Sequence, residues 1–427
     1  MVSFLVKLLS EPAIVLGLVA CVGLIAMKNK PSNVVTGTVK TILGFMVLSA
    51  GSTIICGALV PFSTMFTQAF GLAGIVPEDN SLVAAVQTVL GFETPLIMLF
   101  SFVINLILAR ITPFKYIFLT GHMMFSFAGT MAIVLDQLGI RGWTAVAIGS
   151  VVEGVSMVLF PAIAQPFVRK ILKTDDVAFG FWGSSLVCLS GWVGGLTAKK
   201  DRDPEKDTWE SVNVPEKLSF LKDMSVLMAI VMAVVYVVTA IAAGPTVVNE
   251  LSGGSNYIIY ALLQGLTFVA GVIVLLQGVR MFLGEIIPAF KGISEKLVPG
   301  ARPALDIPIF YASGPVATTV GFIAAMVGGF IATTITSQMS VVVLPGVIGL
   351  YFMGAAAGVF GDKLGGKRGA VVSGLFLGFV FTMLVAVAYP LIDVARYGVK
   401  GLWFASSDAI IVSAVMKLLG MLFGIAH

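Results

Sequence analysis

Long apolar segments follow one another through almost the whole chain, and this pattern limits the fold more than any single motif. Each segment is close to the ~20 residues that an α-helix needs to cross a bilayer. Only 11% of the 427 residues are charged, against roughly 25% in soluble domains. The segments lie at 12–27, 35–58, 95–110, 114–136, 143–168, 180–198, 224–243, 256–287, 305–335, 338–360, 368–394 and 405–425. The sequence predicts an all-α polytopic membrane protein with about 10–12 membrane segments, some of them broken or re-entrant.

One long hydrophilic stretch, from Lys199 to Asp223, divides the chain. We therefore expect a first membrane repeat at 1–198, a central loop at 199–223 and a second membrane repeat at 224–427. The first apolar segment lacks a basic leader and a small-residue cleavage site, which favours a retained span over a signal peptide. The net charge of +4 comes from loop residues. It fits an inner membrane and excludes nucleic acid as a partner. The distribution of basic residues does not fix the side of the amino terminus.

The two halves share a pattern of glycine and proline that predicts an internal duplication. Four residues recur 227 positions later: Gly44, Gly51, Gly57 and Pro61 match Gly271, Gly278, Gly284 and Pro288. Further matches follow at offsets of 225 and 224, including Gly121 with Gly346 and Pro166 with Pro390. Repeats of this kind, usually inverted, are typical of transporters, whose substrate sites lie where broken helices of the two repeats meet.

The stretch from Gly271 to Asp306 places charges and helix breakers at membrane depth. Arg280 and Glu285 interrupt the apolar run, prolines at 288, 299 and 303 predict breaks, and Asp306 precedes the next apolar run. Such a segment is tolerated only where it faces protein or a water-filled cavity. We therefore interpret it as one wall of a substrate site.

Four other acidic or basic positions have a functional and a structural interpretation. His122 lies in mid-segment, where an imidazole can bind a polyol hydroxyl or be packed in the core. Asp306 can cap the helix that follows it, bind a substrate hydroxyl, or do both. Glu93 precedes a proline-started segment and fits an interfacial cap, whereas Glu153 lies deeper. The three cysteines are far apart in apolar segments, and no spacing indicates a metal or cofactor site.

Three stretches resemble the ascorbate-specific IIC permease of the bacterial phosphoenolpyruvate-dependent sugar phosphotransferase system, in the ascorbate/galactitol superfamily. They are TVKTILGFMVLSAGS, FLTGHMMF and QGVRMFLGEIIPAFKGISEKLVPGA with ALD after it. The resemblance implies a multi-pass inner-membrane homodimer in which each protomer has a dimerising domain and a mobile core domain, both built from the two repeats. It also implies a phosphorylated IIB protein as phosphoryl donor, with IIA upstream.

The resemblance further implies substrate contacts, of which some are retained and others replaced. Retained are Ala50, Gly51, Ser52, His122 and Asp306. A glutamine four residues after the histidine is Ser126 here, and a His-Gln pair is replaced by Ser184 and Ser185. A threonine-tyrosine pair becomes Asn80 and Ser81. Because polar sites select ligands by their hydrogen-bond partners, a small sugar or polyol other than ascorbate stays open as the substrate.

The mechanism expected from this resemblance is import by an elevator-type movement with concomitant phosphorylation, in which Asp306 positions or deprotonates a substrate hydroxyl. The main alternative is a proton- or sodium-coupled secondary transporter with Glu93, Glu153 or Asp306 as the ion-linked carboxylate. A membrane sensor or scaffold would leave the duplicated segments unexplained.

Overall fold

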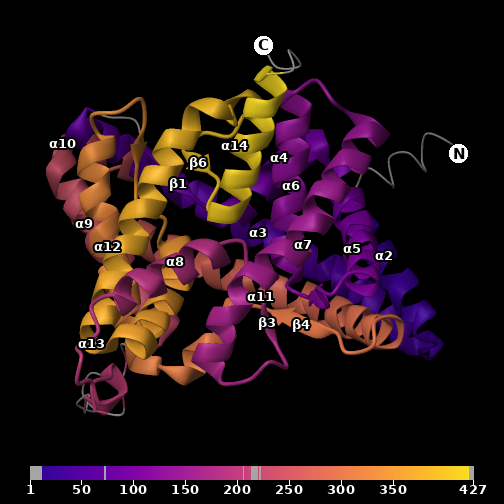
Figure 1. Cartoon of the computed structure of the whole chain (residues 1–427). Coiled ribbons are helices and arrows are strands. Elements are labelled where there is room, and N and C mark those ends of the chain that lie inside the picture. The colour runs from indigo at the N-terminus through magenta and orange to yellow at the C-terminus, as the bar shows by residue number, and fades with distance from the viewer. Residues whose placement is uncertain (1–11, 72–73, 205, 213–219, 221–222, 423–427) are drawn as a thin grey trace, which may run out of the picture.

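The computed structural model describes residues 12–71, 74–204, 206–212, 220 and 223–422, and it is dominated by helices (Figure 1). The first half contains α2 (Pro12–Ala26), α3 (Pro31–Phe70), β1 (Gly74–Pro77), α4 (Asp79–Leu90), α5 (Glu93–Ile111), β2 (Tyr116–Phe118), α6 (Gly121–Gln137), α7 (Gly142–Leu172), β3 (Ala178–Phe179), α8 (Ser184–Gly195) and η1 (Trp209–Ser211). The second half contains α9 (Met224–Ala243), α10 (Pro245–Ser252), α11 (Tyr257–Leu297), β4 (Arg302–Leu305), η3 (Ile307–Ser313), α12 (Pro315–Thr336), β5 (Val342–Val343), α13 (Val347–Ala388), η4 (Tyr389–Leu391), η5 (Ala395–Tyr397), β6 (Leu402–Trp403) and α14 (Ser407–Leu422).

The described helices confirm an all-α polytopic membrane protein. Six of them are long and apolar enough to cross a membrane, and a seventh span results if α9 and α10, bent by 117°, count as one. Helix α13 comprises two helices joined at Gly366, where φ is 75° and ψ is −162°. Shorter helices, α4, α6, α8 and α14, each follow a strand closely. Several apolar segments of the sequence are therefore short helices that start inside the fold.

Two small parallel sheets, which the sequence analysis did not predict, organise the interior. One has the strand order β5-β1-β6 and the other β2-β4-β3. In the first, Ile75 pairs with Val343 and Val76 with Leu402. In the second, Phe118 and Ala178 both pair with Ala304. Each sheet thus has a central strand from one half of the chain and two flanking strands from the other half.

The strand positions agree with the spacing of the sequence repeat. Strands β1 and β4, the two central strands, begin 228 residues apart at Gly74 and Arg302. The flanking strands β2 and β5 begin 226 residues apart, and β3 and β6 begin 224 apart. This exchange of strands between halves is consistent with a duplication, which stays a prediction.

The prolines at 288 and 61 do not break their helices, contrary to the prediction for the stretch that begins at Gly271. Helix α11 continues through Pro288 and ends at Leu297, before Pro299, and α3 continues through Pro61. A proline removes one hydrogen bond and bends a long helix without necessarily ending it. The chain turns instead at Gly300, whose φ of 73° favours glycine.

Glycines allow the long helices to touch. A Cβ on Gly51 of α3 would lie 2.4 Å from the backbone nitrogen of Leu275 in α11. A Cβ on Gly271 of α11 would lie 3.0 Å from the backbone nitrogen of Ile55 in α3. These two glycines therefore allow the close contact between α3 and α11.

Hydrogen bonds show which helix ends lie together. Glu93 Oε1 accepts from the backbone N–H of Gly142 at 3.0 Å, so α5 and α7 start at the same end of the molecule. The Tyr397 hydroxyl donates to Asp136 Oδ2 at 2.6 Å and brings the end of α13 to that side. The carboxyl ends of α5 and α7 and the break at Gly366 therefore lie at the opposite end.

The central loop packs at this opposite end and is not a free linker. Asp362, fully buried beside the break in α13, accepts from the Thr208 hydroxyl and from the backbone N–H of Trp209 at 2.9 Å. Trp209 Nε1 donates to the Lys367 carbonyl at 2.9 Å. Glu210 Oε1 accepts from the backbone N–H groups of Val316 and Ala317 at 2.7 and 3.0 Å and so caps α12.

Basic residues gather at the end of the molecule that holds the central loop, which we call the basic end. They are Arg110, Lys115, Arg169, Lys170, Lys173, Lys199, Lys200, Arg202, Lys206, Arg302, Lys363, Lys367 and Arg368. The end that holds Gly142 carries fewer: Arg141, Arg396, Lys400 and Lys417. Because cytoplasmic loops are rich in lysine and arginine, we infer that the basic end faces the cytoplasm.

This orientation predicts the accessibility of single cysteines. In a background without native cysteines, Lys200→Cys at the basic end should react with an impermeant maleimide only after the cells are opened. Gln338→Cys, exposed beyond the end of α12 at the opposite end, should react in intact spheroplasts. The reverse pattern of labelling would overturn the assignment.

Candidate functional site

The candidate site lies where the carboxyl ends of the strands meet. Strand β2 leads to the start of α6, β4 to η3 and β3 to α8. Parallel strands place the residues that follow them at the same edge of a sheet. His122, Asp306 and Ser184, each close behind its strand, are therefore brought to one edge although they are far apart in the sequence.

His122 and Asp306 face one another at this edge. His122 Nε2 lies 3.8 Å from Asp306 Oδ2, and the side chains are 13% and 37% exposed. Asp306 Oδ1 accepts from the backbone N–H of Ile307 at 2.8 Å, so Asp306 caps η3 as the sequence suggested. A separation of 3.8 Å is too long for a hydrogen bond, which leaves both facing atoms able to bind a hydroxyl.

The second ring nitrogen of His122 also lacks a protein partner. Nδ1 is buried and has no hydrogen bond with any of the described residues. Buried polar atoms are nearly always paired. The His122 ring is therefore held by no hydrogen bond from the described residues, and a polar ligand at Nε2, which faces Asp306, would give it one.

Polar side chains hold the strands that carry this pair. Asn105 donates to the Tyr116 carbonyl at 3.0 Å and accepts from the Phe118 N–H at 3.0 Å, which fixes β2 against α5. Arg302, at the start of β4, pairs with Asp175 Oδ2 at 2.5 Å. The hydrogen bond from Arg169 to Asp175 holds the pKa of that carboxyl below its usual range. The supports of both strands thus lie at the basic end.

Ser184 and Ser185 bind a carboxylate that the sequence analysis missed. Asp408, fully buried in the first turn of α14, accepts from the Ser184 hydroxyl at 3.1 Å through Oδ2 and from the Ser185 hydroxyl through Oδ1. The signal was present in the sequence, because FWGSS at 181–185 resembles WFASS at 403–407, directly before Asp408. The edge of one sheet therefore contacts the edge of the other.

The β5-β1-β6 sheet has a similar cap. Asp79, at the start of α4, accepts from the Ala405 N–H at 2.7 Å and from the Ser406 hydroxyl. Asn80 and Ser81, which replace the threonine-tyrosine pair, follow it in the same turn. Glu78 Oε2 accepts from the Ser81 N–H at 2.5 Å. Carboxylates thus occupy helix starts at the carboxyl ends of both sheets.

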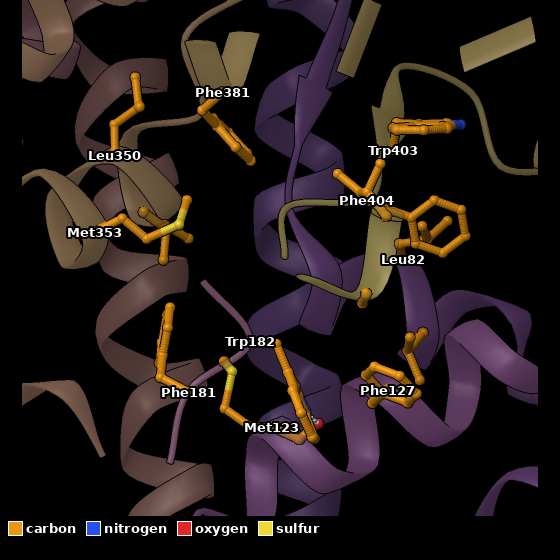
Figure 2. Close-up of a cluster of buried hydrophobic side chains, with 14 of the residues drawn as sticks. Leu82, Met123, Phe127, Phe181, Trp182, Leu350, Met353, Phe381, Trp403 and Phe404 are labelled. Atoms are coloured by element: carbon orange, nitrogen blue, oxygen red, sulfur yellow. Dashed lines mark hydrogen bonds between the residues drawn. The ribbon is translucent and has the colours of Figure 1, made fainter. Parts of the chain in front are cut away.

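An aromatic cluster joins these helix starts (Figure 2). The Trp182 ring packs against Phe118 and Phe127, with both centroid distances 4.5 Å. Its Nε1–H donates to the Met123 carbonyl at 2.7 Å, one residue after His122. Figure 2 shows Trp182 beside Met123, with Phe404 of the other sheet's edge in the same cluster. Rigid rings therefore fix the spacing between α6 and α8.

The remaining predicted site residues lie on the helices around this edge. Ser126 is buried one turn after His122 on α6. The Phe45 and Phe125 rings, 5.5 Å apart, bring α3 against α6. On α3, Ala50 is exposed and Gly51 is buried, while the side chain of Ser52 lies outside the described part of the structure. Arg280 is exposed on α11, and the side chain of Glu285 likewise lies outside the described part.

The two additional acids lie on the α5–α7 pair, away from the strand ends. Glu93 caps the start of α7 through Gly142, as described above. Glu153 is fully buried on α7 beside Ser101, and neither carboxyl oxygen has a hydrogen bond with the described residues. Within those residues no cluster of three or more His, Cys, Asp or Glu side chains could hold a metal ion.

The fold and this interior polar site define a multi-pass membrane transport protein. The family comparison is more specific: the chain belongs to the family described as the PTS system sugar-specific permease component, which it matches over residues 7–408. The family confirms a multi-pass protein of the bacterial inner membrane that takes part in sugar transport.

One curated relative extends this result. The chain is similar to the ascorbate-specific PTS system EIIC component of Mycoplasma pneumoniae (strain ATCC 29342 / M129 / Subtype 1), with 26% identity over 440 residues. The match covers 90% of this chain and 66% of the relative, so this chain spans a little under two thirds of that protein's length. The resemblance in the sequence analysis to an ascorbate-type IIC permease is confirmed.

Proposed function

We propose that this chain is the IIC permease that imports a small sugar, sugar acid or polyol, L-ascorbate included, and presents it to a phosphorylated IIB protein. The observation that carries the proposal is the facing pair of His122 and Asp306 at the meeting point of the two sheets. Both atoms of this pair can bind a hydroxyl, and the pair lies inside a protein of the sugar-permease family.

In this mechanism Asp306 orients the substrate hydroxyl and accepts its proton as the oxygen attacks the phosphorus of the phosphocysteine on IIB. The P–S bond breaks, the thiolate leaves, and the sugar phosphate is released. His122 binds a neighbouring hydroxyl and fixes the orientation. IIB docks at the basic end, since that end faces the cytoplasm, and it is recharged by IIA.

Transport requires that the substrate site open to each side of the membrane in turn, and for this the site must move past a stationary part of the protein. We propose an elevator-type movement in which the two sheets with α6, α8, α12 and α13 form the mobile core. A second copy of the chain forms the frame together with the remaining helices and the membrane lipid. The close packing of α13 against α12 and α8 supports motion as one body.

The test uses membrane vesicles loaded with phosphorylated IIB. Labelled substrate should accumulate inside as the sugar phosphate, and accumulation should stop when IIB is unphosphorylated. Accumulation of free sugar without phosphorylated IIB would overturn the proposal.

A second candidate, ion-coupled transport, is favoured by Glu153. Its carboxyl group is fully buried and has no hydrogen bond to the described residues, and buried carboxyl groups in membrane helices are typical of proton-linked sites. An uncoupler separates the two candidates. Uptake driven by phosphorylated IIB should survive a protonophore, whereas ion-coupled uptake should stop.

A further inference from the structure

We propose that Asp408 makes Ser185 a hydrogen-bond acceptor toward the site, so that the permease selects a neutral polyhydroxylated substrate over an anionic sugar acid. The inference rests on the proposed function in taking this edge to be a sugar site. It assigns the substrate class and a positioning residue, Asp408, which acts through Ser185.

The hydrogen bonds of Asp408 use both serine protons. Oδ2 accepts from the Ser184 hydroxyl at 3.1 Å and from the Ser185 backbone N–H at 3.4 Å, while Oδ1 accepts from the Ser185 hydroxyl. Asp408 and Ser184 are fully buried, whereas Ser185 is half-buried. A serine hydroxyl has one proton and two lone pairs. Ser185 can therefore offer only lone pairs to a ligand, which must be the donor.

Asp306, which follows the neighbouring strand β4, likewise offers hydrogen-bond acceptors to a ligand. One of its oxygens accepts from Ile307, and the other, beside His122, has lone pairs free for a ligand. A polyol hydroxyl can donate to both Asp306 and Ser185. A carboxylate or enolate oxygen offers only lone pairs, and close to Asp306 it would also meet a like charge.

The backbone links bring the chain segment that enters α8 close to Asp306. The Gly180 N–H donates to the Leu305 carbonyl at 2.8 Å, so the chain that enters α8 runs directly beside Asp306. Trp182, between Gly180 and Ser184, is bonded to Met123 beside His122. Figure 2 shows this tryptophan beside Met123 in the aromatic cluster.

Helix starts normally favour anions, but here the protein's own carboxylates already occupy them. The start of α8 gives the Ser185 N–H to Asp408. The start of η3 gives the Ile307 N–H to Asp306, and the Ala405 N–H, just before α14, is bonded to Asp79. An anionic substrate would have to compete with these internal carboxylates, whereas a neutral one would not.

The experiment measures binding to the purified full chain by calorimetry, with matched ligand pairs that differ in one carboxylate. The pairs are galactitol with D-galactonate and D-glucitol with D-gluconate, and L-ascorbate is tested alongside. At least one hexitol should bind about tenfold or more tightly than its aldonate and than L-ascorbate. Equal or tighter binding of the anionic members, or failure of both hexitols to bind, would overturn the inference.

Asp408→Asn tests the positioning role. Its amide N–H₂ donates to a serine oxygen and frees that hydroxyl proton for the ligand, so the hexitol-to-aldonate ratio should fall about tenfold. Asp362→Asn makes the same chemical change in another fully buried carboxylate, far from the strand ends, and should leave the ratio unchanged. A folded Asp408→Asn protein with the wild-type ratio would contradict the assignment.

Ser185→Ala supplies a second variant if Asp408→Asn does not fold. It removes one acceptor without leaving a charge unpaired, so hexitol affinity should fall about fivefold while aldonate affinity stays constant. An unchanged hexitol affinity would count against the proposal. The binding experiment requires no IIB. If the chain binds hexitols selectively but phosphorylated IIB does not phosphorylate them, the proposed function is refuted and this inference is not. Phosphorylation of L-ascorbate in preference to hexitols would refute this inference alone.

Discussion

Asp306→Asn is expected to reduce substrate phosphorylation in IIB-loaded vesicles by about 100-fold or more, within the range that general-base residues contribute. The substitution is nearly isosteric. Its carbonyl oxygen can still accept from Ile307, which holds Asp306 in place at 2.8 Å. What it removes is the basic oxygen beside His122. The measured quantity is the initial rate of sugar-phosphate formation at saturating substrate.

The control is Glu93→Gln, which makes the same carboxylate-to-amide change at the start of α5. Glu93 caps α7 through Gly142, at the end of the molecule away from the basic end. The rate of sugar-phosphate formation by the Glu93→Gln protein should stay within about twofold of wild type, since an amide oxygen can still accept the hydrogen bond from the Gly142 N–H. A purely positioning role for Asp306 would instead raise KM with an unchanged maximal rate, and such a result would remove its role as a base.

Local sequence signals predicted which residues of this site cap helices, but they did not predict which distant residues those side chains contact. Asp306, between two prolines, was expected to cap a helix, and it does so at Ile307. Glu93 was expected to be an interfacial cap, and it caps a helix, although a neighbouring one. A cap depends on the few residues around it, and a local pattern can therefore reveal it.

Asp408 escaped notice because its role depends on a contact across 223 residues. The stretch directly before it, WFASS, resembles FWGSS at 181–185, but this likeness does not by itself show that Asp408 contacts Ser184 and Ser185. The strands that create this contact contain only two to four residues each. Such short runs carry no recognisable alternation, so the two sheets were invisible in a sequence of continuous apolar segments.

One expected helix break was wrong and another was confirmed. Proline drew attention to position 288, but α11 passes through it, whereas the break in α13 at Gly366 lies between the segments expected at 338–360 and 368–394. The Gly366 backbone has a positive φ, and a Cβ there would lie 2.5 Å from an Asp207 carboxylate oxygen, so glycine fits this position. The composition of the segment does not reveal which of its glycines takes this conformation.

Gly321→Val is expected to separate α12 from α13 and to abolish substrate binding. These two helices lie side by side in Figure 1. A Cβ on Gly321 would lie 2.3 Å from the Gly354 carbonyl oxygen and 2.5 Å from the Gly358 Cα. Both neighbours are backbone atoms, so no side chain can rotate away. Gly321→Ala alone should cost about 1–3 kcal/mol of stability, and the branched valine more.

The matched control is Gly57→Ala, since a Cβ at Gly57 would meet nothing within 4 Å. Replacing glycine in an open helical position gains up to about 1 kcal/mol of helix propensity. Gly57→Ala should therefore keep or raise the melting temperature in detergent, whereas Gly321→Ala should lower it. Equal melting temperatures for the two variants would contradict the close packing of α12 on α13.

The loss of binding follows from where α12 begins. Helix α12 starts at Pro315, directly after η3, and η3 is capped by Asp306. A tilt of α12 that relieves the contact at Gly321 would pull on η3 and change the 3.8 Å separation between Asp306 and His122. Since misplacement by about 1 Å can cost a site 100-fold, Gly321→Ala should weaken hexitol binding more than its effect on melting implies. Unchanged hexitol affinity in a destabilised Gly321→Ala protein would show that the core does not move as one body.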